Sequence, residues 1–502
     1  METQTAGEAH VTTNRWVALT VLILPVLLIS MDGTILGFAI PKLSASLDPS
    51  SSQLLWIIDI YAFVLAGLLV TMGVLGDRIG RRKLLMLGAA GFSLASIFAA
   101  FATSAEMLIA ARALLGVAGA TLMPSTLSLI RNIFTDDRER QFAIAVWATT
   151  FAVGSAVGPV VGGFLLEHYW WGSIFLMAAP TTALLLVLAP LILPESKDPS
   201  PGPFDLMSAG LSMTAMLPTV YAIKITAERG FSMTVLVALI IGVVSATMFI
   251  RRQRSTEDPM IDISLFSVPR FRSAVIGNMI ACFGFAGSMY FLTQYMQLVL
   301  DMTPMRAGIQ LMPAVIASIV TMLLSPVASA RVGAFTVISI GLAAGALGFG
   351  LMVIAPDSGS VSLATTAIVL IGAGLGAALT VSIDGIIAAV PPERAGAGAS
   401  VSETANELGT AMGTAVLGSI AAAVYRSRLS AATTVPPDYL VRAKETLGEA
   451  TVLSVELGGP EGEALMAAAK EAFIGGLRLA SAVAVVALAL ATASAVRYRS
   501  AN

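Results

Sequence analysis

Residues 54–61 read LLWIIDIY, and the apolar run that they open ends in GVLGDRIGRRK at residues 73–83. The run stays apolar for about 20 residues, the length that crosses a bilayer as an α-helix. One carboxylate, Asp59, lies inside this expected helix, and a glycine-rich basic turn follows it. A charge inside a membrane helix indicates a functional site, and the basic turn indicates the cytoplasmic side of the membrane.

The composition of the whole chain is that of a polytopic membrane protein. Of the 502 residues, 56% are hydrophobic and only 12% are charged, and the mean hydropathy is +0.86. Soluble domains contain about 25% charged residues. A soluble fold would leave much of this apolar surface exposed, so the sequence predicts a membrane protein.

The sequence lacks the motifs of common catalytic and metal sites. It has one cysteine, Cys282, two histidines, His10 and His168, and no P-loop, H-E-x-x-H or G-x-S-x-G motif. We therefore expect no intrachain disulfide, no metal site, no cofactor and no enzymatic activity, and an ATP-driven pump is poorly supported.

Fourteen apolar runs have the length of a membrane span. They lie near residues 16–43, 52–76, 82–103, 106–132, 139–167, 171–193, 204–226, 231–252, 271–300, 304–330, 334–355, 359–390, 394–427 and 471–497. The joins near 330–334 and 390–394 are short, so this count depends on reading them as turns. The runs predict an all-α fold with four parts. These are a cytoplasmic N-terminus at 1–15, a six-helix bundle at 16–193, an inserted helix pair at 204–252, and a second six-helix bundle at 271–497.

The positive charges of the short loops predict the orientation. Lysines and arginines gather in alternate loops, at 78–83, 131–140, 251–272 and 394, whereas the opposite short loops hold few. Because positive charge marks the cytoplasmic side, we expect both termini on the cytoplasmic face of the cytoplasmic membrane.

One connection, residues 428–470, is far longer than the others. Its signals predict a helix through about Leu457, a turn, and a second helix from Glu461. The orientation places this helical hairpin outside the cell. A lid or structural cap is one interpretation, and a role in gating or substrate binding is the other.

The turn at 73–83 resembles the signature G-x-L-a-D-r-x-G-r-k between the second and third helices of the major facilitator superfamily. Its glycines allow a tight turn and close helix approach. Its aspartate can pair with an arginine or face a helix N-terminus in one conformation and release it in another. We interpret the turn as a conformational latch, and a solvated basic loop is the alternative. The latch residues are Gly73, Asp77, Arg78, Gly80 and Arg81.

Two further signatures agree with this resemblance. Arg112, in LxxxRxxxG at 108–116, resembles the family's fourth-helix arginine, which the resemblance links to proton coupling. An arginine in a membrane helix needs a partner, and a snorkelling surface arginine is the alternative. Residues 154–163 (GSAVGPVVGG) resemble the fifth-helix signature typical of exporters. We interpret them as a packing hinge formed by Gly154, Gly158, Pro159 and Gly162.

The first apolar run contains MDGTILGFAIP at 31–41, which resembles the first-helix pattern of the fourteen-helix drug:proton antiporter family. Phrases at 55–61, 123–128 and 403–409 also match, so the resemblance covers nearly the whole chain. It implies a major facilitator fold of two six-helix bundles plus two inserted helices, with a cavity near the membrane midplane and export driven by the proton gradient.

Exchange of cations for protons needs carboxylates inside the membrane. Asp32 and Asp59 lie in the first two runs, and Glu403 and Glu407 lie one helical turn apart in the thirteenth. A buried acid can bind either a proton or a cationic drug, and this competition couples the two fluxes. The resemblance places functional acids at these four positions. Pairing with Arg112 is the structural alternative for the first two, and a cytoplasmic helix start is the alternative for the glutamates.

Recognition of varied lipophilic cations needs adaptable and aromatic surfaces. The chain has 23 methionines and 21 phenylalanines. Related pumps can carry a further acid on the tenth helix, but residues 312–318 contain none, which puts divalent cations in doubt. The candidate cavity residues are Trp56, Tyr290, Gln294 and Met312.

These patterns predict a proton-coupled antiporter that exports lipophilic monocationic drugs, dyes and quaternary ammonium compounds. Its expected partners are these small molecules, protons and membrane lipid, with no nucleic acid, and we expect a monomer. A dedicated exporter of an endogenous metabolite or antibiotic is the alternative. A membrane enzyme or receptor would need a catalytic set or soluble domain that the sequence lacks, and an importer would more often lack the signature at 154–163.

Overall fold

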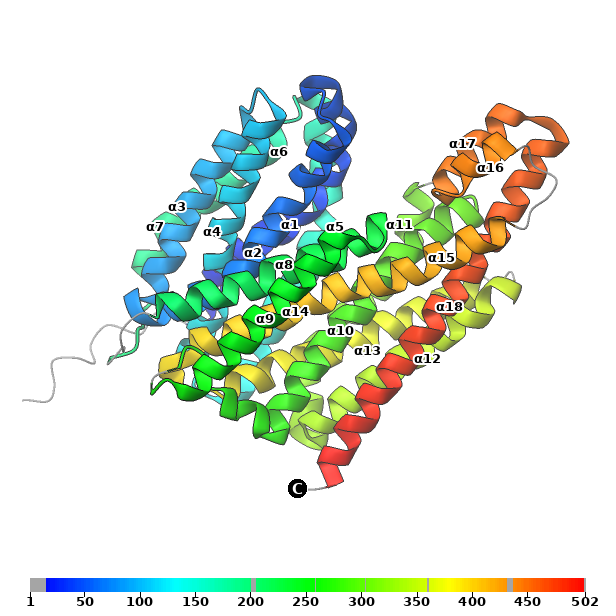
Figure 1. Ribbon diagram of the computed structural model, residues 1–502. Helices are drawn as coiled ribbons and strands as arrows, with labels where there is room; N and C mark the ends of the chain where they lie inside the picture. Colours follow the sequence, from blue (N-terminus) through cyan, green and yellow to red (C-terminus); the bar gives the residue numbers. More distant parts are fainter. Residues whose placement is uncertain are drawn as a thin grey trace, which may run out of the picture. The chain divides into compact units, whose positions relative to one another are not determined.

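The computed structural model describes residues 15–199, 205–257, 259–302, 304–358, 361–430 and 437–500. In these residues every regular element is a helix (Figure 1). They divide into two compact units. Unit 1 lies within Met1–Val220, Ala238–Arg272 and Ile383–Thr404, and unit 2 within Tyr221–Val237, Ser273–Ser382 and Ala405–Asn502. The predicted all-α membrane fold is confirmed.

Unit 1 begins with the helices of the first block. They are α1 (Arg15–Leu47), α2 (Ser51–Ile79), α3 (Arg81–Ala100), α4 (Ala105–Ile133), α5 (Asp137–His168), α6 (Ser173–Leu176) and α7 (Ala178–Ile192). α2 starts at a capping box made by Ser50 and Gln53. It ends at Gly80, which has a φ of +110°. A residue with a side chain would be strained in this backbone conformation. The residue types at both ends of α2 therefore explain its length.

α4 is the most buried helix of this block, and small residues let its neighbours approach closely. A Cβ on Gly116 would lie 2.7 Å from the carbonyl oxygen of Tyr61 on α2. Gly119 faces the same tyrosine ring. Close backbone approach between small residues is the usual way in which membrane helices gain packing contacts. α4 and α2 therefore pack closely against each other in unit 1.

The helices α8 (Leu206–Arg229) and α9 (Met233–Ser255) are joined at one end by an ion pair. Asp205 accepts hydrogen bonds from Arg252 at 2.8 and 3.0 Å. It also caps α8 by accepting from the Ser208 backbone N–H at 3.0 Å. α8 then packs on α2, where Leu217 covers Gly67.

The later helices lie wholly or partly in unit 2, and three of them have one end in unit 1. They are α10 (Pro269–Gln294), η2 (Tyr295–Val299), α11 (Pro304–Val332), α12 (Ala334–Ser358), α13 (Val361–Ala388), α14 (Ala395–Met412), η4 (Gly413–Leu417), α15 (Gly418–Leu429), α16 (Pro437–Ala443), α17 (Leu447–Leu457) and α18 (Gly459–Ser500). A short turn, η3 (Pro392–Arg394), precedes α14 in unit 1. α18 packs along both α12 and α15 (Figure 1). Its buried alanines and leucines supply much of the unit 2 core.

Thirteen helices of the described residues are long and apolar enough to cross a membrane. They correspond to thirteen of the fourteen expected runs. The remaining run, 271–300, falls on α10 and η2. Several side chains of this run lie outside the described residues. The fourteenth span therefore stays a prediction, as does the division into two bundles and an inserted pair.

The long connection at 428–470 is helical, with one difference from the expectation. The helix predicted through Leu457 is interrupted between α16 and α17, because Thr446 caps a new helix by accepting from the Glu449 N–H at 3.0 Å. Gly458, with φ +64°, ends α17. The second predicted helix is continuous with the last span, since α18 runs unbroken from Gly459. Residues 431–436 lie outside the described residues, and the external hairpin stays a prediction.

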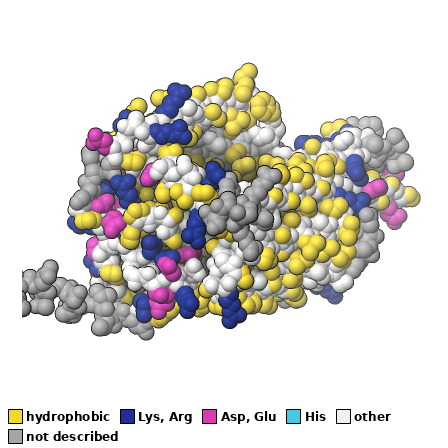
Figure 2. All heavy atoms as spheres, turned by 90° about the horizontal axis from the view of Figure 1, so that it is seen from below, with side chains coloured by type: hydrophobic (Ala, Val, Ile, Leu, Met, Phe, Trp, Pro, Cys, Tyr) yellow, Lys and Arg dark blue, Asp and Glu magenta, His cyan; other side chains and the backbone are white. Residues whose placement is uncertain are grey.

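Surface side chains separate by type, as they do in a protein that faces lipid. Figure 2 shows one face, on part of which lysine, arginine and acidic side chains gather, while hydrophobic side chains cover other parts. Large apolar side chains are exposed along α9 and α11, including Val243, Val244, Ile316 and Leu324. Exposed apolar surface of this extent indicates contact with lipid.

Replacement of Asp205 by alanine tests the joint between α8 and α9. Loss of a helix cap costs about 0.5–2 kcal/mol, so we expect a lower midpoint of thermal unfolding in detergent. Hydrogen bonds from Arg252 hold the pKa of Asp205 below its usual range. A lowered folded-state pKa means that the stabilisation is complete above the pKa of the unfolded state and is lost as the pH falls through the folded one.

The difference in midpoint between wild type and Asp205→Ala should therefore be full at pH 7 and shrink below about pH 4. Glu257→Ala, at an exposed loop acid, is the control and should leave the midpoint unchanged. A difference that stays the same between pH 7 and pH 3 would contradict the assigned role of the ion pair.

Candidate functional site

Arg112 joins three helices of unit 1 from a buried position. Its Nη1 donates to the Asp32 carboxylate on α1 at 2.7 Å, and its Nε donates to the Ile57 carbonyl on α2 at 3.1 Å. Its guanidinium also lies 4.6 Å from the ring centroid of Tyr61. Only 2% of Arg112 is exposed, so the snorkelling alternative is wrong for this conformation. The pairing with Asp32 is the structural alternative that the sequence left open for this acid.

The acid of α2, Asp59, is 8% exposed and lies two residues beyond the carbonyl group that Arg112 contacts. A carboxylate at this depth is costly to keep charged without compensation. The structure thus places this acid in a buried position within the candidate span Trp56–Ile79.

The glycines of α5 bring this helix close to α1 beside Asp32. A Cβ on Gly154 would lie 3.0 Å from the Leu27 carbonyl oxygen, and one on Gly158 would lie 3.2 Å from that of Met31. Gly162 faces Ile35 one turn further. Pro159 lies inside the same helix. The predicted packing role of these residues matches the geometry, whereas the hinge function stays a prediction.

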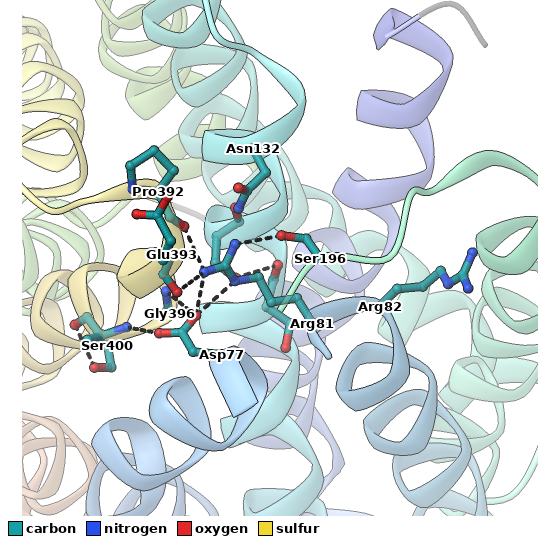
Figure 3. Close-up of polar contacts among 12 residues, drawn as sticks. Asp77, Arg81, Arg82, Asn132, Ser196, Pro392, Glu393, Gly396 and Ser400 are labelled. Carbon is teal, nitrogen blue, oxygen red and sulfur yellow. Dashed lines mark hydrogen bonds and ion pairs between the residues drawn. The ribbon is translucent and has the colours of Figure 1, made fainter. Parts of the chain in front are cut away.

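Asp77 at the end of α2 accepts hydrogen bonds from the first turn of α14. The N–H groups of Gly396 and Ala397 donate to its two carboxylate oxygens at 2.8 and 3.1 Å (Figure 3). Asp77 also forms an ion pair with Arg81, with 2.7 Å between Oδ1 and Nη2. The carboxylate thus meets an arginine and a helix N-terminus, the two partners that the sequence predicted for the latch.

Arg81 extends this contact to the turn before α14. Its Nη2 donates to the carbonyl oxygens of Pro392 and Glu393, both at 2.8 Å, and its Nη1 donates to Ser196 Oγ at 2.8 Å. Arg81 is 1% exposed. Figure 3 shows its guanidinium between these groups, with Arg82 turned away from them. Arg78, by contrast, is partly exposed.

Two glycines permit this contact between α2 and α14. A Cβ on Gly73 would collide with the Gly396 carbonyl oxygen, and a Cβ on Gly396 would lie 2.8 Å from the Asp77 carboxylate carbon. Gly80, with its positive φ, then turns the chain so that Arg81 begins α3 beside Asp77. The spacing of glycines in the motif is therefore a packing requirement.

Sequence reasoning missed the segment that follows α7. Glu195 accepts hydrogen bonds from the N–H groups of Arg82 and Lys83, both at 3.1 Å, and so caps α3. The Ser196 carbonyl oxygen accepts from the Arg81 N–H at 2.9 Å. The Asp198 N–H donates to the Asp77 carbonyl oxygen at 2.7 Å. Two acids directly after the sixth apolar run, on the side of the basic loops, were the signal available in the sequence.

A third buried ion pair was not predicted from the sequence. Arg140 on α5 donates through Nε to Asp384 on α13 at 2.9 Å, and through Nη1 to Asp137 at 2.7 Å. Arg140 is 2% exposed and Asp384 is 6% exposed. This pair joins two segments 244 residues apart within unit 1. An acid inside the apolar run 359–390 was its only sequence signal.

The two glutamates of α14 have different surroundings. Glu403 is 4% exposed and belongs to unit 1, whereas Glu407, one turn later, is partly buried in unit 2. The ammonium group of Lys224 on α8 interacts electrostatically with Glu407. Sequence reasoning did not predict this basic partner. It follows from the fold, because the two residues lie 183 positions apart in the chain.

The four cavity candidates are less well defined. Trp56 is 40% exposed and makes an edge contact with Phe63, with ring centroids 6.1 Å apart. In unit 2, Met312 is 44% exposed and Gln294 is partly buried. The side chain of Tyr290 lies outside the described part of the structure. Among the described residues, no three histidine, cysteine, aspartate or glutamate side chains gather as a metal site would require.

Comparison with known proteins agrees with this geometry. The family described as Major Facilitator Superfamily matches residues 22–414. The multidrug efflux pump LfrA of Mycolicibacterium smegmatis is 45% identical over 492 residues, which cover 98% of this chain and 97% of that protein. The methyl viologen resistance protein SmvA of Salmonella typhimurium is 35% identical over 461 residues, covering 92% and 93%. The human organic anion transporter MFSD10 shares the fold, with a TM-score of 0.61 and 14% identity over 95% of this chain and 99% of that one.

The adjacent arginines Arg81 and Arg82 provide a matched test of the latch. Arg81→Gln removes charge-assisted hydrogen bonds to the turn before α14, each worth about 1.5–3 kcal/mol. We expect α3 and this turn to separate in a larger fraction of molecules, by about tenfold or more. Spin labels at Lys83→Cys and Glu393→Cys, in a Cys282→Ser background, would report the distance.

Arg82→Gln is the control, because Arg82 contacts Glu195 and the Leu193 carbonyl oxygen rather than the turn before α14. It should leave the distance distribution close to that of wild type. Equal distributions for Arg81→Gln and wild type would show that the contact does not hold the two segments together.

Proposed function

Because this chain belongs to the major facilitator superfamily, we propose that it is a proton-coupled antiporter that exports lipophilic monocationic drugs, dyes and quaternary ammonium compounds. Its relatives are multidrug efflux pumps and resistance proteins, so drug-like small molecules are its expected substrates. Methyl viologen, named in one relative, is an organic cation. The observation that carries the proposal is the placement of carboxylates inside membrane-spanning helices, above all Asp59 and Glu407.

These two acids are the principal proton and cation sites. Asp59 is buried, and Glu407 has Lys224 as an electrostatic neighbour. In a medium of low dielectric constant a carboxylate is stable when it is protonated or when a cation lies beside it. A lipophilic cation that reaches the acid displaces the proton, and a proton that arrives later displaces the cation. The ammonium group of Lys224 can neutralise Glu407 between these two events.

Asp32 and Glu403 assist in this scheme. Asp32 is paired with Arg112, so protonation of Asp32 would release Arg112 and change how α1, α2 and α4 are joined. The ion pair therefore offers a way for a proton to alter helix packing. Glu403 is buried one turn before Glu407 on α14, so a charge on one acid affects the other.

The latch serves the conformational cycle. In this structure Asp77 and Arg81 hold the beginning of α14 against α2. Alternating access requires a contact of this kind to form in one state and break in another. With both termini in the cytoplasm, the latch lies on the cytoplasmic side and its closure prevents entry from there. The protein works as a monomer, without a cofactor or nucleic acid.

The proton gradient supplies enough energy for this exchange. A tenfold pH gradient provides about 1.4 kcal/mol per proton, and each net charge moved through 100 mV provides about 2.3 kcal/mol. Exchange of one proton for one monovalent cation is electroneutral and uses the pH gradient alone. Two protons per cation would also use the membrane potential.

Proton release from the purified protein tests the proposal. Addition of ethidium or tetraphenylphosphonium to weakly buffered wild type in detergent should release about one or more protons per bound cation. Asp59→Asn and Glu407→Gln should each lower the release by about half or more, because each removes one exchangeable proton. A pH indicator measures release, and equilibrium binding of the same cation measures occupancy.

Glu456→Gln, at an exposed acid of α17, is the control and should release protons as wild type does. Cation binding without proton release in wild type would rule out exchange at these acids. Absence of both binding and release would instead favour the second candidate, a dedicated exporter of an endogenous metabolite or antibiotic.

A further inference from the structure

Two neighbouring cavities in unit 2 share a pair of arginines. The larger, of about 670 Å³, lies where α15 ends against α18 and is lined by both Arg428 and Arg478. The smaller, of about 340 Å³, is lined by the same two arginines and also by Lys470 and Glu471. The function proposed above uses none of these four residues.

The larger cavity combines charge with an apolar wall. Besides the arginines, Val353 of α12, Val424 of α15 and Leu479 of α18 line it. Leu479 is 47% exposed, so this wall continues onto the outer surface of the unit. A cavity of this kind fits an amphipathic molecule, with a polar group at the arginines and hydrocarbon along the wall.

Gly475 gives Arg428 its place in this cavity. A Cβ at residue 475 would lie 2.6 Å from three atoms of the Arg428 guanidinium group. On the next residue, a Cβ at Gly476 would lie 2.6 Å from the Ala421 carbonyl oxygen. The two glycines therefore allow α15 and α18 to approach and leave room for a guanidinium group between them.

The charges of the two linings are predominantly positive. Three basic residues, Arg428, Lys470 and Arg478, lie beside one acid, Glu471. Lys470 is already paired with Asp301, at 2.6 Å between Nζ and Oδ2. The two arginines thus supply a positive field in which an anion is favoured.

From their positions in the sequence we expect both arginines near the edge of the hydrocarbon layer. Arg428 lies in the last turn of a span that ends at Leu429. Arg478 lies about two helical turns into the apolar run near 471–497. Long basic side chains at such positions extend toward the interface, where the phosphodiester groups of lipids lie.

We propose that these cavities bind the headgroup of an anionic phospholipid. Arg428 and Arg478 donate charge-assisted hydrogen bonds to the phosphate, which the planar guanidinium group suits well. The acyl chains of the lipid lie along Val424 and Leu479. The site is separate from the acids of the export cycle, and the proposal does not depend on their role.

Lipid retention by the full-length protein tests this site. The protein in detergent is incubated with phosphatidylglycerol or with phosphatidylcholine of the same acyl chains, and native mass spectrometry measures the bound lipid. We expect phosphatidylglycerol to be retained about tenfold better. Arg428→Gln and Arg478→Gln should each remove most of this preference, because each removes charge-assisted hydrogen bonds.

Two further variants distinguish loss of the lipid site from loss of the fold. Arg426→Gln removes an exposed arginine about 200° around the same helix from Arg428, and it should retain lipid as wild type does. Gly475→Ala keeps both arginines but displaces the Arg428 guanidinium group, and it should weaken phosphatidylglycerol retention several-fold. If Arg478→Gln does not fold, Arg428→Gln and Gly475→Ala decide the question.

Three results would overturn the proposal. The first is equal retention of the two lipids by wild type. The second is wild-type retention of phosphatidylglycerol by both Arg428→Gln and Gly475→Ala. The third is complete displacement of phosphatidylglycerol by millimolar inorganic phosphate, which would identify a site for the free anion rather than for a lipid.

Discussion

The carboxylate of Asp77 is the group on which the arrangement of α2, α3 and α14 depends. It accepts from two backbone N–H groups at the beginning of α14 and pairs with Arg81 at the beginning of α3. A helix N-terminus carries partial positive charge and N–H groups without partners in the helix. One carboxylate can both balance this charge and accept hydrogen bonds from these N–H groups. Because Arg81 also holds the carbonyl groups of residues 392 and 393, a single ion pair orders the whole turn before α14.

Buried ion pairs join other helices of unit 1 in the same way. Asp32 and Arg112 connect α1 with α4, and Arg140 and Asp384 connect α5 with α13. Such a pair contributes little net stability, because desolvation offsets the attraction, yet removal of one partner leaves an uncompensated charge. These pairs are therefore well suited to a protein that must change conformation. They can separate when a proton or another charge replaces the lost partner, and they resist separation otherwise.

Helix α8 has contacts in both units. Within unit 1 it packs on α2 at Gly67, eight residues beyond Asp59. Within unit 2 its Lys224 interacts with Glu407. The helix thus meets α2, which carries one of the acids proposed for coupling, and α14, which carries another. This helix therefore places a basic group beside one of the acids proposed for proton and cation exchange.

The sequence by itself determined the class of protein, most of its helices and the two residues, Asp77 and Arg81, on which the contact with α14 depends. Apolar length predicts spans without knowledge of packing, because hydrocarbon excludes unsatisfied backbone groups from all but helices and closed barrels. The motif at 73–83 predicted both kinds of partner for Asp77, since an acid among glycines and arginines has few others. The motif did not identify Glu195, Ser196, Gly396 or the carbonyl groups of residues 392 and 393. Elsewhere, the sequence left the role of Asp32 open between proton coupling and a pairing with Arg112. Only the tertiary structure decided which charges meet, because Arg140 and Asp384, or Lys224 and Glu407, lie far apart in the chain, and no local pattern records which helices pack together.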